Sequence, residues 1–301
     1  MKNKKIIVTG GAGFIGSNLV DELVNLGAEV MVIDNMVSGN RDYLNPKAKF
    51  AEVDICNLEV IKPLFLGVDY VFHLAALPRV QYSIEHPLET DLVNVGGTRN
   101  VLIAAKEGGV KRVIYSASSS AYGDQEMMPL TEDLPANPKS PYGLQKYLGE
   151  WYLKTWSQVF GLETVSLRYF NVYGPRFSAE GAYALVIGKF LKQRALGEPL
   201  TVTGDGTQTR DFTHVSDVVR ANLLAATVSK VGKGEVINIG SGKNYSINEI
   251  AKIIGGPIKY VEARLEPHDT LADNSLAKKL LGWVPKESIE KAIKELKNEK
   301  V

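Results

Sequence analysis

The feature that most constrains the fold is a glycine-rich turn near the start of the chain, Thr9-Gly10-Gly11-Ala12-Gly13-Phe14-Ile15-Gly16. The apolar run 5–8 before it predicts a buried strand, and residues 17–24 after it have helical periodicity. In a strand, turn and helix of this kind, glycines allow a tight turn, close approach of the backbone to a pyrophosphate, and close packing of the helix. The N–H groups at the helix start then face the phosphates. The turn therefore predicts a dinucleotide site.

A carboxylate after the second strand indicates which dinucleotide is bound. The strand-like run 29–33 ends at Asp34, close to the offset at which a carboxylate binds the ribose hydroxyls. Asp34 would repel a 2′-phosphate, and residues 35–37 supply no positive charge to hold one, so the sequence favours NAD over NADP. Arg41 is the nearby cation that leaves NADP open. Asp54 ends a third strand-like run, 50–53, and is expected either to meet the adenine or to cap the next segment.

The alternation of strands and helices predicts an α/β fold. Strand-like runs at 70–74, 112–116 and 164–168 alternate with helical patterns, which is typical of a Rossmann-type, doubly wound parallel sheet. Loop signals between 175 and 206 interrupt this rhythm, 235–239 reads as a strand that returns to the sheet, and 289–296 as a packing helix. We predict an NAD-binding domain at 1–172 and 209–240, and a smaller, discontinuous α/β substrate-binding domain at 173–208 and 241–301.

Composition excludes several classes of function. A formal charge of +1 over 301 residues, without a basic block, argues against a nucleic-acid partner or an acidic membrane surface. The single cysteine, Cys56, excludes an internal disulfide and fits a reducing compartment. No uncharged apolar run reaches about 18 residues and no signal segment starts the chain, so we expect a cytoplasmic protein. The four histidines and Cys56 lack ligand spacing, so no metal site is predicted.

A second motif, Tyr142-Gly143-Leu144-Gln145-Lys146, supplies a candidate acid–base group. On a helix, Tyr142 and Lys146 share one face. A lysine cation beside the phenol, together with an oxidised nicotinamide, would lower the tyrosine pKa from about 10 and make it a general base. The run Ser116-Ala117-Ser118-Ser119-Ser120 places hydroxyls at the carboxyl edge of the sheet, where one of them could share a proton with Tyr142.

These motifs together resemble the extended short-chain dehydrogenase/reductase family, and within it the NAD-dependent sugar-nucleotide epimerases. The resemblance spans nearly the whole chain. Beyond the two motifs above, it rests on the segments 73–76, 118–123, 140–142, 168–176, 210–212, 238–240 and 278–283.

The resemblance implies a specific reaction. Tyr142 would take the proton from the sugar 4-hydroxyl while hydride leaves C4 for NAD, and the 4-keto intermediate would turn over and regain the hydride on its other face. Ser118 would be the hydroxyl partner of Tyr142, and Lys146 would hold the cofactor ribose. The implied cofactor-binding residues are Gly10, Gly13, Phe14, Ile15, Gly16, Asp34, Asn35, Ser38, Gly39, Asp54, Ile55, Leu74, Ala75, Ala76, Asn94, Ser116, Tyr142, Lys146 and Tyr169.

The resemblance also implies a UDP-sugar site. Its residues would be Val80, Ser118, Ser119, Tyr142, Asn171, Leu185, Val186, Thr201, Val202, Arg210, Arg264, Asp269 and Thr270. Arg210 and Arg264 would bind the diphosphate; an ion pair with Asp211 is the alternative for Arg210, and the segment after Arg264 is about one residue shorter than the family pattern. Thr270 stands where a bulky aromatic would exclude a 2-N-acetyl group. The expected substrates are therefore UDP-Glc/UDP-Gal together with UDP-GlcNAc/UDP-GalNAc.

Other functions stay open at this stage. A small residue at position 270 also fits a UDP-glucuronate 4-epimerase. A sugar-nucleotide dehydratase would need an Asp-Glu pair where this chain has Ser119-Ser120. A non-enzymatic NAD(P)-sensing protein would not need Tyr142, Lys146 and Ser118 together. By resemblance we also expect a homodimer formed by the helix carrying Tyr142 and the helix at about 92–107.

Overall fold

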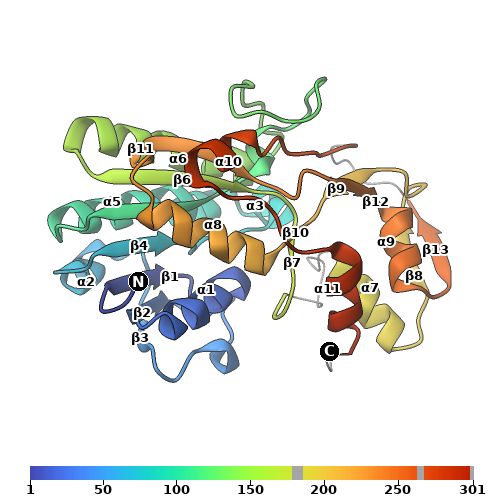
Figure 1. The fold of residues 1–301 in the computed structure, drawn as a ribbon, viewed down its shortest axis with the longest axis horizontal. Helices are drawn as coiled ribbons and strands as arrows, with labels where there is room; N and C mark the ends of the chain where they lie inside the picture. The colour runs from blue at the N-terminus through green and yellow to red at the C-terminus, as the bar shows by residue number, and fades with distance from the viewer. Residues whose placement is uncertain (178–185, 263–267, 299–301) are drawn as a thin grey trace.

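A seven-stranded parallel sheet forms the centre of the computed structural model, which describes residues 1–177, 186–262 and 268–298 (Figure 1). The strand order is β11-β6-β5-β4-β1-β2-β3, and every neighbouring pair is parallel. The strands are β1 (Lys5–Thr9), β2 (Glu29–Asp34), β3 (Lys49–Glu52), β4 (Tyr70–His73), β5 (Arg112–Ser118), β6 (Glu163–Tyr169) and β11 (Lys233–Ile239). The predicted doubly wound α/β fold is confirmed.

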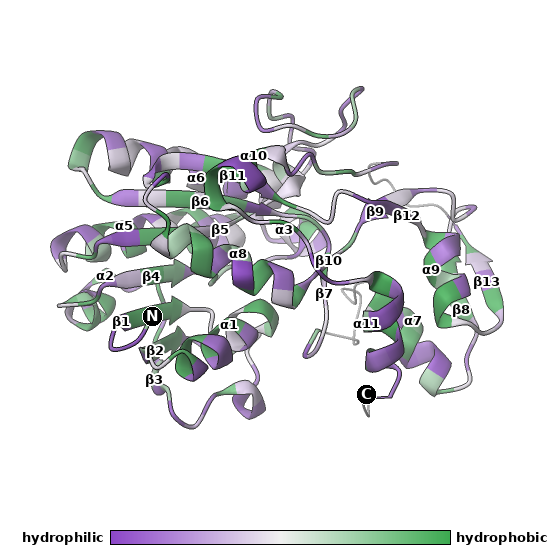
Figure 2. Ribbon diagram, in the orientation of Figure 1, coloured by the Kyte–Doolittle hydropathy of each residue, from purple (hydrophilic) through white to green (hydrophobic). Residues whose placement is uncertain are grey.

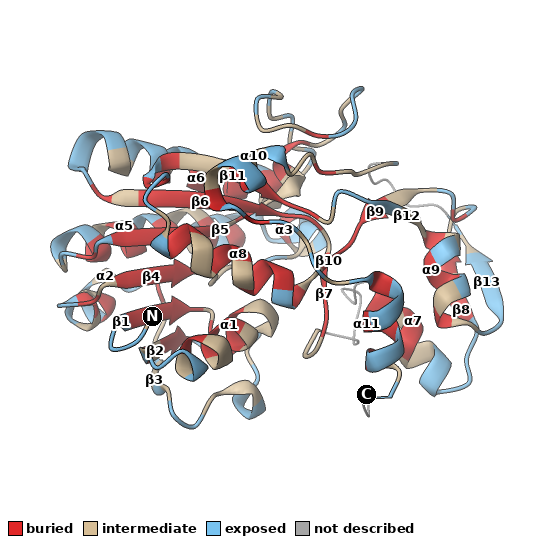
Figure 3. Ribbon diagram, in the orientation of Figure 1, coloured by how far each residue is buried: buried red, intermediate tan, exposed pale blue. Residues whose placement is uncertain are grey.

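Each face of the sheet has its own hydrophobic core, because successive strand residues point to opposite faces. Ile6 and Val8 enter one core with residues of α1 (Phe14–Asn25), α8 (Val215–Thr227) and α10 (Ser275–Leu281). Ile7, between them, enters the other core with residues of α2 (Leu58–Ile61), η2 (Lys62–Phe65), α5 (Thr98–Glu107) and α6 (Pro141–Phe160). In Figure 3 the strands are almost entirely buried between these helix layers.

The remaining elements gather at the far end of the molecule. There α7 (Val186–Ala195), α9 (Ile247–Ile254) and α11 (Ile289–Leu296) share a third core with β8 (Leu200–Thr203), which pairs in parallel with the largely exposed outer strand β13 (Ile258–Val261). Figure 2 shows apolar and polar residues side by side on α7 and α9. Two further short pairs, β9 (Thr209–Asp211) with β12 (Asn244–Ser246) and β7 (Val172–Tyr173) with β10 (Thr213–His214), link this end to the main sheet.

The expected division into two domains stays a prediction. The third core contains residues of 173–208 and 241–301, whereas Ala277, Leu281 and Trp283 belong to the core of the large sheet. Among the described helices, none combines the length and apolar character needed to cross a membrane.

Candidate active site

The site residues converge at the carboxyl edge of the large sheet. Thr9, His73 and Tyr115 are register partners across β1, β4 and β5, and Ser118 pairs with Tyr169 across β5 and β6. The glycine-rich turn, the segment after β4, Ser118 and the segment after β6 therefore leave the sheet side by side. Ligands of open α/β sheets bind at this edge.

The glycine-rich turn forms a cradle that side chains would fill. Gly10 has φ +72°, and a Cβ there would lie 2.6 Å from the backbone nitrogen of Ala75. A Cβ on Gly16 would lie 2.1 Å from the carbonyl oxygen of Gly10. Gly13 caps α1 without any side-chain hydrogen bond, so the N–H groups at the helix start face outward from the turn. This arrangement fits a pyrophosphate.

Asp34 fits the ribose of NAD. It lies at the end of β2, is 8% exposed, and its carboxylate accepts hydrogen bonds from Ala12 N (3.0 Å) and Met36 N (2.9 Å), which fix its orientation beside the cradle. Arg41, in η1 (Arg41–Tyr43), is paired with Glu52 at 2.6 Å and stacks over Phe50. The cation that left NADP open is thus committed to a neighbouring carboxylate, which strengthens the preference for NAD.

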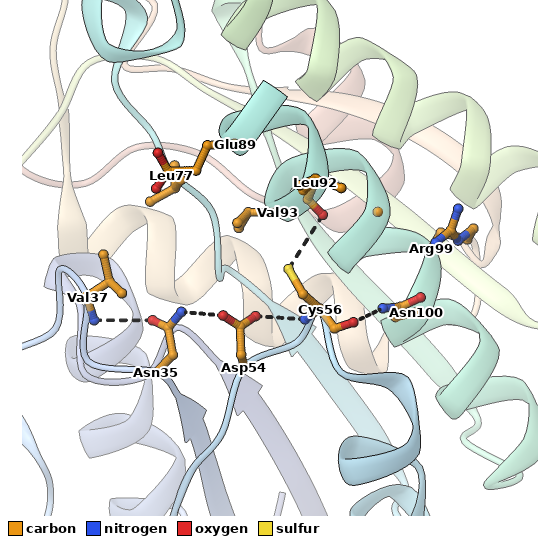
Figure 4. A pocket seen from close by; sticks show the side chains of 11 residues that line it. Asn35, Val37, Asp54, Cys56, Leu77, Glu89, Leu92, Val93, Arg99 and Asn100 are labelled. Carbon is orange, nitrogen blue, oxygen red and sulfur yellow. Dashed lines mark hydrogen bonds between the residues drawn. The ribbon is translucent and has the colours of Figure 1, made fainter. Parts of the chain in front are cut away.

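Next to Asp34, at the same edge of the sheet, lies a cavity of about 320 Å³ that is lined by Asn35, Asp54 and Cys56 among others (Figure 4). Asn35 donates to Asp54 (2.9 Å), and the other oxygen of Asp54 accepts from Cys56 N (2.7 Å). Burial alone would raise the pKa of Asp54, but these hydrogen bonds outweigh it and hold the pKa below its usual value. Asp54 thus caps the following turn while facing the cavity. Burial raises the pKa of the Cys56 thiol to about 12, so this thiol is unreactive at neutral pH.

Helix α6 positions the acid–base pair. Ser140 caps its start by accepting from Gly143 N (3.1 Å), and Tyr142 N donates to Ser83 Oγ (3.0 Å) on α3 (Val80–Glu85). One turn later, Lys146 Nζ donates to the carbonyl oxygen of Ser116 (2.7 Å). The Tyr142 side chain is partly buried, and Ser118 lies close enough to its hydroxyl to act on its pKa. The three predicted catalytic residues are therefore brought together.

Without the cofactor, the protein's own groups do not lower the pKa of Tyr142. Burial raises the pKa of Tyr142 to about 12, and Ser118 acts against this rise. Burial also lowers the pKa of Lys146 to about 7, opposed by the charge of Glu150. Desolvation is the largest cause of both shifts. Ionisation of Tyr142 near neutral pH thus requires a further positive charge, which an oxidised nicotinamide supplies.

A buried charged network, which sequence reasoning missed, lies one turn beyond Lys146. Glu150 accepts two hydrogen bonds from Arg168, at 2.8 and 2.7 Å, and both side chains are buried. The Arg168 guanidinium lies 4.5 Å from the ring centre of Tyr122, whose hydroxyl donates to Asn238 (2.7 Å). The i, i+4 spacing of Lys146 and Glu150 on one helix is the sequence signal that could have indicated the first member.

His73 and two predicted residues, Asn94 and Tyr169, support the cofactor edge from within. His73 is fully buried and bonded to Thr9 (2.7 Å) and Thr98 (2.9 Å), and burial lowers its pKa to about 3. Asn94, in the π-helical turn η3 (Leu92–Gly97), donates to Gln145 (2.8 Å) and to the carbonyl oxygen of Leu77 (3.2 Å). The Tyr169 hydroxyl is bonded to Asn222 on α8.

The predicted sugar side centres on Asn171, Asp211 and Thr270. Asn171 Nδ2 donates to the carbonyl oxygen of Asp211 (3.1 Å) and to Thr270 Oγ1 (3.4 Å). The buried Asp211 carboxylate accepts from Ser241 N, Gly242 N and Ala272 N, and so joins three segments beside Thr270. Arg210 is buried and donates to the carbonyl oxygens of Thr209 and His268.

The other predicted substrate residues are placed less uniformly. Asp269 accepts from Thr209 Oγ1 (2.5 Å), next to Thr270, and Ser119 begins η4 (Ser119–Ala121) directly after Ser118. Val80 is the first residue of α3 and is 45% exposed, and Val186 is the first residue of α7. Thr201 is bonded to Gln193, and the Val202 side chain is buried in the third core. Leu185 and Arg264 lie outside the described residues.

Comparison with known proteins agrees with this geometry. Residues 6–240 match the model of the NAD dependent epimerase/dehydratase family. A UDP-glucose 4-epimerase from Thermotoga maritima, solved with UDP-glucose, is 39% identical, with a TM-score of 0.92 and coverage of 96% of both chains. A UDP-N-acetylglucosamine 4-epimerase from Methanobrevibacter ruminantium, solved with UDP-N-acetylmuramic acid, is 36% identical over 99% of this chain and 98% of its own, with a TM-score of 0.94. A UDP-glucose 4-epimerase from Thermus thermophilus, solved with NAD, is 32% identical over 96% of both chains, with a TM-score of 0.88.

Proposed function

The chain belongs to the NAD-dependent epimerase/dehydratase family, and on this basis we propose that it interconverts UDP-hexoses that differ in configuration at C4. The observation that carries the proposal is the assembly of Tyr142, Ser118 and Lys146 at the edge where the glycine cradle and Asp34 fit a dinucleotide. A binding protein without chemistry has no use for a buried phenol aligned with a hydroxyl and an amine.

Each of the three residues has a distinct task. The cradle at Gly10–Gly16 would hold the pyrophosphate of NAD and Asp34 its ribose; when bound, NAD accepts and returns the hydride. Tyr142 removes the proton from the sugar 4-hydroxyl and returns it to the 4-keto intermediate. Ser118, close to Tyr142, would share that proton, and its hydroxyl donates to Ser120 Oγ (3.0 Å). Lys146, held by Ser116, orients the cofactor ribose and favours the phenolate.

The substrate range follows from position 270. Thr270 is small, and its hydroxyl bonds Asn171 and Asp211 N, so it stays beside the segment expected to bind the nucleotide diphosphate. We therefore propose that UDP-GlcNAc/UDP-GalNAc are accepted along with UDP-Glc/UDP-Gal. UDP-glucuronate is the second candidate substrate, because a small residue here fits its ring equally well. Ser119-Ser120 stand where a dehydratase needs an acid–base pair, which argues against that reaction.

Proton NMR of the purified protein, with and without added NAD, tests these proposals. UDP-GlcNAc, UDP-Glc and UDP-GlcA are incubated separately and the anomeric signals are followed for the 4-epimer. UDP-GalNAc as a product supports both the mechanism and the open pocket at Thr270. UDP-Gal alone keeps the mechanism and rejects the pocket argument, and the UDP-GlcA epimer alone makes the second candidate correct. No epimer from a protein that holds NAD would refute the proposed function.

We also propose that the enzyme is a cytoplasmic homodimer. In its favour, α6 and the segment 80–99 expose large apolar side chains beside one another, among them Leu88, Leu92, Leu144 and Trp151. The helix α6 packs against α3, α4 (Pro87–Asp91) and η3, the elements of the segment 80–99. An exposed apolar surface of this kind is typical of a contact with a second protein chain.

A further inference from the structure

One face of α1 is fastened to the segment Gly174–Phe177, far away in sequence, and the reaction described above gives this contact no task. Phe14, Asn18 and Asp21 lie on one face of α1, spaced four and three residues apart. Phe14 meets Phe177 with ring centres 6.2 Å apart. Asn18 Nδ2 donates to the carbonyl oxygen of Pro175 (3.1 Å). Asp21 forms an ion pair with Arg176, Nη2 to Oδ2, at 2.7 Å. We call residues 174–177 the strap.

Arg176 is the residue on which the strap depends. It adopts φ +70°, in the left-handed region where a non-glycine residue is strained. Its guanidinium is 31% exposed, stacks over Tyr43 at 5.6 Å, and is paired with an Asp21 carboxylate that is 33% exposed. Asn45 donates to the other oxygen of Asp21 (2.7 Å), so the carboxylate is fixed from both sides. The side-chain contacts offset the backbone strain.

The strap ends on the part of α1 that contacts the cofactor. Phe14 is the first residue of α1 and follows Gly13, whose neighbouring N–H groups fit the pyrophosphate. The ring of Phe177 lies beside Phe14, so the strap contacts α1 at the residue that directly follows the glycine cradle. Movement of α1 away from the sheet edge would require separation of all three contacts.

We infer that Arg176, paired with Asp21, is a positioning residue that keeps the glycine cradle closed and thereby slows the release of NAD. The inference rests on the proposed function only in that NAD is the resident dinucleotide. An epimerase that regenerates its cofactor in each cycle gains from slow release, because loss of the reduced cofactor during turnover would leave the 4-keto sugar without its hydride.

The test measures release of NAD from the purified holoenzyme. Protein carrying its copurified NAD is diluted, and the NAD that passes an ultrafiltration membrane is quantified against time. Asp21→Asn keeps the shape and the acceptor for Asn45 but removes the charge. Arg176→Gly removes the guanidinium and suits φ +70°. Each change should speed NAD release about tenfold, roughly the effect of one charge-assisted hydrogen bond. The double variant should be no faster than either single one, because both remove the same contact.

Glu22→Gln is the matched control. Glu22 neighbours Asp21 on α1, and within the described residues its side chain makes no hydrogen bond or ion pair, so its loss should leave NAD release unchanged. A thermal melt of each variant separates release of NAD from partial unfolding. If both strap variants release NAD as slowly as Glu22→Gln does, the inference is overturned. It is also overturned if the strap variants release NAD at the wild-type rate and only their KM for the UDP-sugar rises. Failure of the epimerase reaction with normal NAD binding would refute the proposed function and leave the strap measurement intact.

Discussion

At the scale of single residues, Tyr142 is a phenol whose ionisation its own protein opposes, since burial raises its pKa to about 12. Tyr142→Phe removes only the hydroxyl, and the ring keeps its place. We expect turnover to fall by about 10²–10⁴, the usual contribution of a general acid–base, while NAD stays bound. Product NMR and the NAD content of the purified variant check this. Tyr147→Phe, on the same helix but stacked on Trp151 away from Ser118, should keep full activity.

His73 should make the protein sensitive to mild acid. Its folded pKa of about 3 lies below the value of about 6.5 in an unfolded chain, so acid protonates the unfolded state first. Stability is unaffected by this residue above pH 6.5 and declines as the pH falls from there toward 3. Between pH 7.5 and 5 the loss is about 2 kcal/mol, from about 1.5 pH units at 1.36 kcal/mol each.

Urea unfolding of the wild type and of His73→Gln at both pH values measures this loss. The variant is less stable at either pH because the bonds to Thr9 and Thr98 are altered, but its stability should fall by about 2 kcal/mol less between the two pH values. Equal losses in both proteins would show that His73 is not the group responsible.

Sequence predicted residues whose task depends on local geometry and missed those that depend on distant contacts. Gly10, Gly16 and Asp34 could be found because a turn and a strand end prescribe them. The pairs Glu150–Arg168 and Asp21–Arg176 could not, because their partners are 18 and 155 residues apart and only the folded chain brings them together. The effect of burial on the pKa of Tyr142 could not be predicted for the same reason, since its burial depends on the tertiary packing.

At the scale of elements, helix α6 is held close to β5 by a glycine. A Cβ on Gly149 would lie 2.4 Å from the hydroxyl oxygen of Tyr115, a residue that is buried under the helix. Glycine-to-alanine changes inside helices usually stabilise by about 1 kcal/mol, so the sign of the effect is informative. We expect Gly149→Ala to destabilise the protein by about 1–3 kcal/mol and to lower turnover, because the helix that carries Tyr142 and Lys146 must shift.

Chemical denaturation and steady-state kinetics of Gly149→Ala test this expectation. Thr155→Ala, at an exposed position of α6, is the control. It should change the free energy of unfolding by no more than about 0.5 kcal/mol and leave turnover unchanged. A stabilised Gly149→Ala variant would mean that the helix does not need this close approach.

The strands of the large sheet could be predicted and the short pairs outside it could not. The seven sheet strands and the last helix follow from apolar runs, the alternation with helices and helical periodicity. The pairs β7–β10, β9–β12 and β8–β13 contain strands of two to four residues outside that alternation, and they form only because the segments meet in space. The π-helical turn at Leu92–Gly97 reads as ordinary helix in sequence, although its wider turn carries Asn94.

At the scale of the whole molecule, the chain returns twice to the large sheet from the smaller end. The strand β11 completes the sheet edge beside β6, and Trp283 then packs against α8 with its indole N–H bonded to the carbonyl oxygen of Asp217 (2.9 Å). This second return was not predicted, because it consists of the short helix α10 and Trp283 after it, without a strand signal. With β11 it connects the smaller end of the molecule to the large sheet at two places.

The largest test at this scale is the predicted homodimer. Trp151 on α6 is 50% exposed and lies on the same helix face as Leu144, which is 46% exposed, while Leu88 and Leu92 contribute 74% and 57% exposed side chains from the neighbouring segment. Aromatic residues near the centre of an interface commonly contribute about 2 kcal/mol or more, so Trp151→Glu should weaken dimerisation at least about 30-fold. Sedimentation of dilute protein should then show a monomer.

Leu196→Glu, which alters a 61% exposed leucine at the opposite end of the molecule, is the control and should sediment as the wild type does. A wild-type monomer would refute the dimer, whereas a Trp151→Glu dimer as stable as the wild type would place the contact elsewhere. Because Tyr142, Ser118, Lys146 and the glycine cradle come from one chain, the monomeric variant should still bind NAD.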